Sequence, residues 1–218
     1  MPEMSDFFKS ACTSRAYSAV AGRVVLPWAL QGLRPSGLGL EIGAGSGAMA
    51  ARFLDRCPDL ALVVTDYDPQ MVTCAHATLT RFGERAVVAR ADAAELPFDD
   101  DRFDVVASFG MLHHVAGWER AIAEAVRVLR PGGRLVGYDV LDTAPVRWAH
   151  RVGETGPSTT LAAGRLESEL ARRAVTEIRT RRAAGGTLVR FIATKAAVTL
   201  RAPAGQPIRR PARDRGRR

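Results

Sequence analysis

Hydrophobic and polar positions change their period repeatedly along the chain. Five apolar runs of strand length are separated by segments in which apolar residues recur near the helix period. Strands are expected at residues 37–42, 60–65, 86–90, 103–108 and 134–140, and helices at about 46–56, 69–82 and 118–129. Because strands that alternate with helices form parallel sheets, this pattern predicts an α/β fold with helices on both faces of one sheet.

The two ends of the chain depart from this rhythm. Residues 4–33 have helical spacing, and Pro27 is predicted to kink that region. After a further helix at about 159–172, apolar runs at 174–181 and 187–196 are separated only by RAAGG, which predicts an antiparallel hairpin. We therefore expect a Rossmann-like, doubly wound, seven-stranded sheet, mostly parallel, with a C-terminal antiparallel hairpin.

Local residues mark two helix ends and the domain limits. Asp68 stands directly before Pro69, which is typical of a helix start. RPGG at 130–133 is expected to end the helix that begins near Trp118. The predicted organisation is a helical cap (1–36), a ligand-binding domain (37–200) and a C-terminal tail (201–218).

Composition limits the class of protein. With 218 residues, of which 47% are hydrophobic, the chain can fill one core. No apolar run approaches the roughly 20 residues of a membrane span, and the first ten residues are acidic where a signal peptide would be basic. We expect a cytoplasmic protein. Cys12, Cys57 and Cys74 form no CxxC pair, so they are interpreted as small buried hydrophobic residues, and no disulfide framework or metal site is expected.

The net charge of +8 is concentrated at one end. The last eighteen residues contain seven Arg and one Asp and so carry +6, which leaves about +2 for the rest of the chain. A Pro-, Gly- and Arg-rich end of this kind is typical of a disordered tail. We expect no nucleic-acid partner, although such an arm can bind phosphates non-specifically, so a nucleic-acid role stays an alternative.

A glycine-rich turn carries the main functional signal. GAGSGA at 43–48 follows a predicted strand and precedes a predicted helix, so its backbone can approach a small cofactor closely. The turn also fits the dinucleotide pattern G-x-G-x-x-G/A, with Asp66 about 20 residues further on. The turn alone therefore does not identify the cofactor.

Three carboxylates at successive strand ends narrow the choice. Glu41 lies two residues before the first glycine of the turn, Asp66 ends the second strand and Asp92 follows the third. Carboxylates accept hydrogen bonds from an ammonium, from ribose hydroxyls and from an adenine amino group, but they repel a pyrophosphate. This set suits S-adenosylmethionine better than a dinucleotide.

Four sequence blocks carry a family resemblance between about Leu38 and Val140. In order they are LEIGAGSG, VVTDYDPQM, RADAAELPFDDDRFDVVASFGMLHHV and AIAEAVRVLRPGGRLVGYDV. The chain resembles the class I S-adenosylmethionine-dependent methyltransferases, most closely the compact branch similar to ubiquinone/menaquinone-biosynthesis methyltransferases. The resemblance implies that residues 37–200 are the S-adenosylmethionine-binding methyltransferase domain.

The same resemblance implies a cofactor site. The methionine part would lie against the glycine turn and Glu41, the ribose against Asp66, and the adenine between Tyr67 and the Asp92–Ala93 segment. The full predicted cofactor-binding set is Glu41, Gly43, Ala44, Gly45, Gly47, Asp66, Tyr67, Asp92, Ala93 and Ser108. Each acidic residue, taken singly, is also interpretable as a helix cap or a solvated loop carboxylate.

The residues for the transfer step are less strongly marked. His113 and His114 follow the fourth strand and are the candidate bases for an acceptor that must lose a proton. Asp139 and Asp142 are further candidates after the fifth strand, and Tyr17 is a candidate for reaching the cofactor. A second set could line a pocket for a hydrophobic acceptor or belong to the core: Val24, Val25, Leu26, Trp28 and Leu30.

The expected function is methyl transfer to an O, N or C atom of a small molecule, such as a hydrophobic metabolite, quinone, lipid or natural product. SFGMLHH at the fourth strand lacks the Asn/Asp-Pro-Pro-aromatic motif of base-modifying enzymes. A modifier of nucleic acid or protein, and a protein that binds the cofactor without methyl transfer, remain the alternatives.

Overall fold

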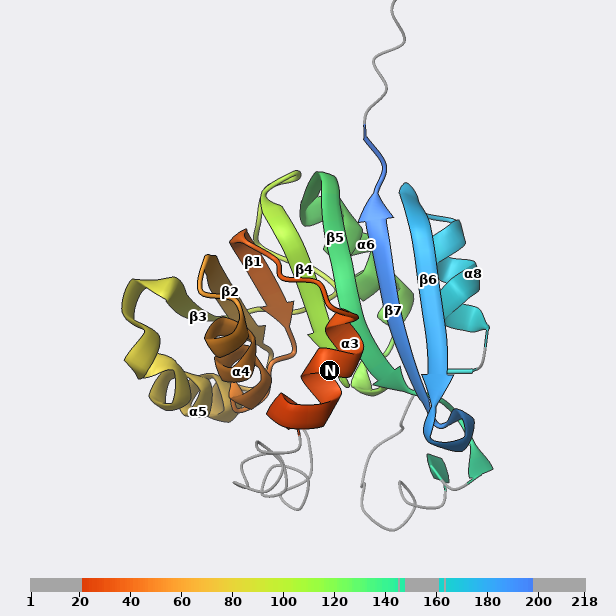
Figure 1. Cartoon of the computed structure of the whole chain (residues 1–218), viewed down its shortest axis with the longest axis horizontal. Coiled ribbons are helices and arrows are strands. Elements are labelled where there is room, and N and C mark those ends of the chain that lie inside the picture. Colours follow the sequence, from red (N-terminus) through yellow and green to blue (C-terminus); the bar gives the residue numbers. More distant parts are fainter. Residues whose placement is uncertain (1–20, 145, 148–160, 163, 198–218) are drawn as a thin grey trace, which may run out of the picture.

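The computed structural model describes residues 21–144, 146–147, 161–162 and 164–197, and contains one seven-stranded sheet of order β3-β2-β1-β4-β5-β7-β6 (Figure 1). The strands are β1 (Gly37–Ile42), β2 (Leu60–Asp66), β3 (Ala86–Arg90), β4 (Phe103–Phe109), β5 (Leu129–Val140), β6 (Val175–Ala183) and β7 (Leu188–Lys195). β1 to β5 pair in parallel, whereas β7 is antiparallel to both β5 and β6. The predicted fold class is confirmed.

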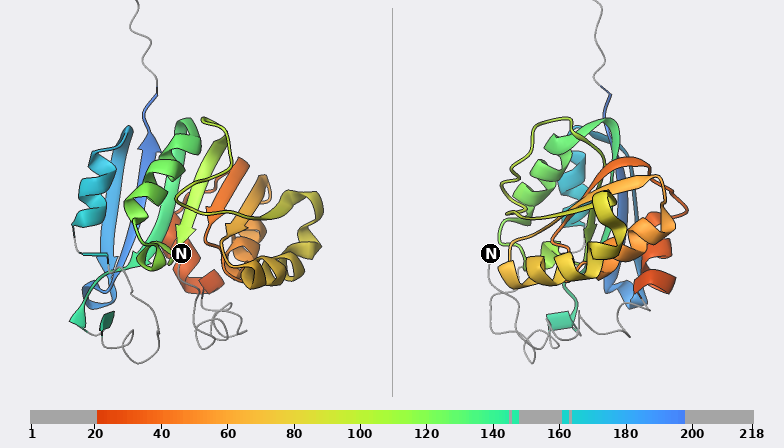
Figure 2. Two further views of the ribbon diagram at one scale, coloured as in Figure 1. Left: turned by 180° about the vertical axis from the view of Figure 1, so that it is seen from behind. Right: turned by 90° about the vertical axis from the view of Figure 1, so that its left-hand side faces the viewer.

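Helices cover both faces of this sheet (Figure 2). On one face lie η1 (Ala21–Val25), α3 (Leu26–Leu30), α4 (Ala48–Arg56), α5 (Pro69–Leu79) and η2 (Thr80–Arg85). On the other lie α6 (Trp118–Val128) and α8 (Arg165–Ala171), while η3 (Leu112–His114) and η4 (Ala184–Gly186) are short connections. Each layer buries its own apolar cluster, centred on Phe53 and on Trp118. β1, β2 and β4 are mainly apolar because they are covered on both sides.

The strand order places the switch in chain direction at β1 and β4. From β1 the chain proceeds outward through β2 to β3, then returns to β4 on the opposite side of β1. The connections after β1 and β4 therefore diverge at the carboxyl ends of two neighbouring strands, which is where open α/β sheets bind their ligands. The glycine turn and both candidate histidines follow these two strands.

Several local predictions are confirmed and others are adjusted. Asp68 is the N-cap of α5, and its side chain accepts from the Gln70 N–H at 2.8 Å. The second helix was expected to begin at Ser46 but begins at Ala48, because Gly47 adopts a left-handed backbone. The region around Pro27 passes from the π-helical η1 into α3. Of the predicted helix at 159–172, the described residues contain α8.

The expectations on cysteines and on membrane spans have mixed outcomes. Cys57 is buried, but Cys74 is only half-buried, so the interpretation of Cys74 as a buried residue is wrong; the buried residues of α5 are Met71, Ala75 and Leu79. Cys12, Tyr17 and the tail at 201–218 lie outside the described residues. No helix in the described part of the chain has the length and apolar character to cross a membrane.

Candidate functional site

Three glycines shape the turn between β1 and α4, each for its own reason. Gly43, Gly45 and Gly47 all have a positive φ, of 63°, 56° and 76°. A Cβ on Gly43 would lie 2.0 Å from Cγ of Met111, and one on Gly47 would lie 3.2 Å from Cα of Ala75 in α5. The segment after β4 therefore covers the start of the turn, and α5 packs against its end. At Gly45 a Cβ would meet no atom within 4 Å, so there only the backbone conformation requires glycine.

Asp66 at the end of β2 holds this turn. Its Oδ2 accepts from the Gly45 N–H at 2.7 Å and its Oδ1 from the Asp68 N–H at 2.9 Å. Burial raises the pKa of Asp66, although backbone donors, those of Asp68 and Gly45 foremost, oppose that shift. Carboxylate oxygens can accept more than one hydrogen bond, so Asp66 can hold the turn and still receive ribose hydroxyls.

Tyr67 and Asp92 have neighbours that restrict how they could contact an adenine. The Arg90 guanidinium carbon lies 5.2 Å from the Tyr67 ring centroid, so stacking there has to use the opposite face. Asp92 Oδ1 accepts from the Ala94 N–H at 2.8 Å, which ties one carboxylate oxygen to its own turn. Ala93, the residue after Asp92, is buried. The predicted adenine contacts of these residues stay predictions.

Glu41 is the most unusual polar residue of the described structure. It is 1% exposed, and neither carboxylate oxygen has a hydrogen-bond partner among the described residues. Burial, with a further contribution from the charge of Asp66, raises its pKa to about 8. Ser108, on the neighbouring strand β4, has a buried hydroxyl that likewise lacks a partner there. Buried polar groups are normally paired, so the surroundings of Glu41 at the end of β1 are suited to a ligand that supplies hydrogen-bond donors.

Replacing Glu41 with glutamine is expected to flatten the pH dependence of folding stability. Its pKa is about 8 in the folded protein and has an ordinary value of 4.5. Between these values the folded protein keeps a proton that the unfolded chain has lost, so stability is highest at low pH and falls as pH rises through 8. Thermal unfolding midpoints measured from about pH 5 to about pH 9 should fall more steeply in the parent protein than in Glu41→Gln. Glu84→Gln, at an exposed position, is the control, and equal slopes in all three proteins would contradict the prediction.

His113 is positioned by Asp139. Its Nδ1 lies 2.6 Å from Oδ1 of Asp139, which is fully buried. Asp139 also accepts from the backbone N–H groups of Leu112 and Val140, both at 2.7 Å. In a pair of this kind the imidazole donates from Nδ1 to the carboxylate oxygen, which leaves the lone pair of a neutral His113 ring at Nε2.

The other candidate bases are placed differently. The His114 ring lies 3.9 Å from that of His113, centroid to centroid. Asp142 pairs with Arg147 at 2.9 Å. The structure therefore makes Asp139 the partner of His113, a relationship the sequence analysis did not predict. A histidine after β4 and an aspartate near the end of β5 could have signalled it, because neighbouring parallel strands bring such residues together.

The set predicted for an acceptor pocket divides in two. Leu26 and Leu30 are fully buried in the cluster beneath α4, which favours their interpretation as core. Val24 is 62% exposed, while Val25 and Trp28 pack against the same cluster and remain partly exposed. Met111 was missed altogether: it is a buried apolar residue whose contact with Gly43 only the folded chain creates.

Comparison with known proteins identifies a family over the centre of the chain. Residues 40–137 match the family described as "Methyltransferase domain". The chain is 39% identical over 132 residues to a malonyl-[acyl-carrier protein] O-methyltransferase of Geobacter sulfurreducens, covering 58% of this chain and 48% of that protein. It is 41% identical over 100 residues to a ubiquinone/menaquinone biosynthesis C-methyltransferase of Paracoccus denitrificans, covering 44% and 40%. The chain thus spans less than half the length of these curated relatives.

Solved structures match the fold. The putative methyltransferase of Haloferax volcanii, in complex with the activator Trm112, aligns with a TM-score of 0.71 at 17% identity, covering 88% of this chain and 95% of that one. The [4+2]-cyclase SpnF aligns with a TM-score of 0.64 at 19% identity, covering 84% and 83%. The predicted resemblance to class I S-adenosylmethionine-dependent methyltransferases is confirmed, and S-adenosylmethionine, the cofactor predicted from the sequence, is that of the matched family.

Proposed function

We propose that this chain, whose residues 40–137 belong to the methyltransferase domain family, transfers a methyl group from S-adenosylmethionine to a small-molecule acceptor. The observation that carries the proposal is Glu41, a buried carboxylate without a partner among the described residues, next to a glycine turn held by Asp66. The ammonium group of S-adenosylmethionine would supply the missing donors. A pyrophosphate would meet two carboxylates instead, which argues against a dinucleotide.

The residues of the turn and of the neighbouring strand ends would hold this cofactor. In the proposed arrangement Glu41 and the turn from Gly43 to Gly47 contact the methionine part, Asp66 the ribose, and Asp92 with Ala93 the adenine edge. Ser108 pairs with Ile42, so its side chain lies on the other face of the sheet from Glu41, and its contact with the cofactor stays a prediction. When bound, S-adenosylmethionine supplies a methyl group on a sulfonium, whose sulfur leaves as a neutral thioether. No covalent enzyme intermediate is needed. The chain therefore has mainly to align the acceptor and exclude water.

The His113–Asp139 pair supports an acceptor that loses a proton. His113 would accept that proton at Nε2, and the buried Asp139 would stabilise the resulting imidazolium. Hydroxyl groups and activated carbon acids need such a base, which favours O- or C-methylation. The names of the relatives above describe O- and C-methyltransferases, in agreement with this proposal. No nucleic-acid partner is proposed, and the cytoplasmic location stays a prediction.

Calorimetric titration with S-adenosylmethionine tests the cofactor site. We expect Asp66→Ala to weaken binding by at least about tenfold, because it removes both a ribose acceptor and the anchor of the Gly45 amide. Asp99→Ala, at an exposed loop position, should bind like the parent protein. A thermal unfolding scan shows whether Asp66→Ala remains folded.

The same titration reports on Glu41. An ammonium beside Glu41 favours the ionised carboxylate, so binding at about pH 7 should release close to one proton in the parent protein and less in Glu41→Gln. Heats measured in two buffers of different ionisation enthalpy give this number. NAD binding that competes with S-adenosylmethionine would refute the cofactor assignment. Cofactor binding without S-adenosylhomocysteine formation across many acceptors would instead favour a non-methylating protein, and the fold match to SpnF makes that outcome worth testing.

A further inference from the structure

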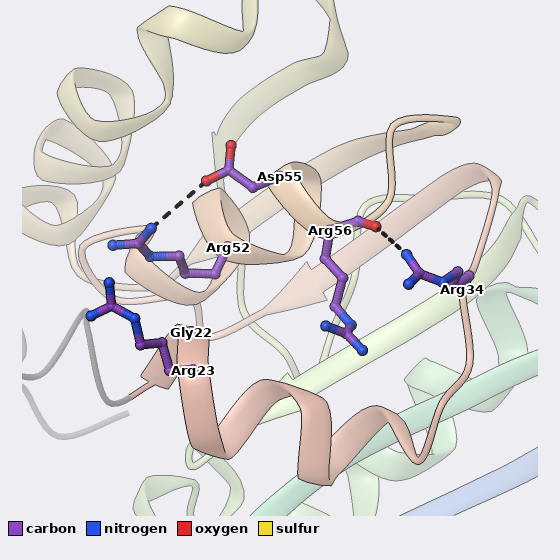
Figure 3. A pocket seen from close by; sticks show the side chains of 6 residues that line it. All are labelled: Gly22, Arg23, Arg34, Arg52, Asp55 and Arg56. Carbon is purple, nitrogen blue, oxygen red and sulfur yellow. Dashed lines mark hydrogen bonds and ion pairs between the residues drawn. The ribbon is translucent and has the colours of Figure 1, made fainter.

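A hollow on the outer side of α4 is lined mainly by arginine side chains. Its volume is about 370 Å³, which is enough for a small ligand. Figure 3 shows Arg23 and Arg52 at one end of the hollow and Arg34 and Arg56 at the other. The residues that line it are Gly22, Arg23, Arg34, Arg52, Asp55 and Arg56.

This arginine hollow has more positive than negative charge. Its one acidic side chain, Asp55, forms a close ion pair at 2.6 Å with Arg81, which is outside the hollow. The distance from Asp55 to Arg52 is longer, 4.0 Å. Within the described ranges, no carboxylate lies within 4.0 Å of Arg23, Arg34 or Arg56. Like charges at close range repel each other, so an anion bound among these guanidinium groups would lower the free energy of the folded protein.

Local contacts restrict two of the four arginine side chains, those of Arg34 and Arg52. The Arg34 Nη1 donates to the carbonyl oxygen of Arg56 at 3.2 Å, which fixes it at the end of α4. The stem of Arg52 packs on Gly22, where an added Cβ would lie 2.7 Å from the Arg52 Cδ. A ligand would therefore find these donors partly arranged, which reduces the entropy cost of binding.

The arginine hollow is separate from the candidate cofactor site. The glycine turn lies at the start of α4, whereas Arg52 lies at its middle and Arg56 at its end. At 1.5 Å per residue, Arg56 is about 12 Å along the helix axis from Ala48. Arg34 precedes β1, at the amino edge of the sheet. An anion in the hollow would therefore lie away from the glycine turn at the carboxyl edge of the sheet.

We propose that the arginine hollow binds the phosphate or diphosphate group of a second ligand, apart from the methyl donor. A phosphate has several acceptor oxygens and up to two negative charges, and guanidinium forks match it in geometry as well as charge. A single carboxylate, with one negative charge, would neutralise less of the excess positive charge around the hollow. The group can belong to a free phosphorylated metabolite or to a phospholipid headgroup.

Calorimetry with inorganic pyrophosphate tests the site on the full chain. The variant Arg34→Gln/Arg56→Gln removes two of the donors and is expected to weaken saturable binding by at least about tenfold. Arg209→Gln/Arg210→Gln makes the same charge change among the C-terminal arginines and should leave the affinity within about twofold. Gly22→Ala changes no charge but displaces Arg52, so it should weaken binding severalfold if geometry matters.

A second arm measures cosedimentation with phosphatidylcholine vesicles that contain phosphatidic acid. Loss of pyrophosphate binding in the Arg34/Arg56 variant supports a free phosphorylated ligand, and loss confined to the vesicle arm supports a lipid headgroup. Unchanged binding by that variant in both arms would overturn the proposal. An equal loss in the Arg209/Arg210 control would also overturn it. Because neither arm uses S-adenosylmethionine or measures methyl transfer, these outcomes are independent of the proposed function.

Discussion

Gly43→Ala is expected to abolish S-adenosylmethionine binding and to destabilise the protein by about 2–5 kcal/mol. Two costs combine at this position. Alanine is strained at the Gly43 φ of 63°, and its Cβ would lie 2.0 Å from Cγ of Met111. The turn would have to move away from the segment after β4, and the amides at its centre would move with it.

A matched glycine separates these two costs. Gly132 also has a positive φ, of 79°, but a Cβ there would meet nothing within 4 Å. Gly132→Ala should therefore show only the backbone cost, about 1 kcal/mol. In the Met111→Ala background the Cγ is absent and only its Cβ, at 2.9 Å, remains close, so Gly43→Ala should cost less there than in the parent protein. Denaturant unfolding of the parent, the three single variants and the double variant measures these costs. Equal losses for Gly43→Ala and Gly132→Ala would refute the packing argument.

His113→Ala is expected to lower kcat about 10²- to 10⁴-fold on an acceptor that must lose a proton, while S-adenosylmethionine affinity changes little. The reason is that this side chain would accept the proton, whereas the cofactor contacts are assigned to other residues. His114→Ala removes the adjacent ring and is the matched control, with a smaller expected effect. Single-turnover rates with S-adenosylhomocysteine as the measured product, alongside calorimetry, separate the two steps.

Asp139→Asn tests the positioning role of Asp139. Asp139 now accepts hydrogen bonds from His113, Leu112 and Val140. An asparagine side chain would point its own N–H group toward one of these donors. We expect Asp139→Asn to lower kcat, as His113→Ala does. The double variant Asp139→Asn/His113→Ala should show no further fall beyond that of His113→Ala, because the two residues act as one unit. If His113→Ala keeps full activity, the acceptor needs no base and the proposed proton transfer is wrong.

Much of the fold could be predicted from local patterns. Strand and helix periods, the glycine turn and the Asp68 cap each depend on residues close together in the chain, so the elements from β1 to β5 were placed to within a few residues, except the start of β5. The last two strands were also recognised, because RAAGG is too short to join parallel neighbours. For the cofactor, the glycine turn left two candidates open, and three acidic residues at strand ends favoured S-adenosylmethionine.

Other features depend on which distant residues meet. His113 and Asp139 are 26 positions apart, yet they pair because β4 and β5 are neighbours. The contact of Met111 with Gly43 depends in the same way on β1 beside β4. The lack of a partner for Glu41 cannot be deduced from its place in the sequence, since burial and hydrogen bonding are properties of the surroundings.

The distribution of charge shows the same division. By sequence, the chain outside the tail is almost balanced, and that balance favours no particular ligand. The fold nevertheless brings Arg23, Arg34, Arg52 and Arg56 from three segments around one hollow, while their nearest acidic neighbour pairs with Arg81. The sequence by itself thus determined the order of elements and the class of cofactor, because both depend on short-range patterns. The tertiary structure decided which charged and polar groups are paired, since pairing depends on distances that only the packed chain sets.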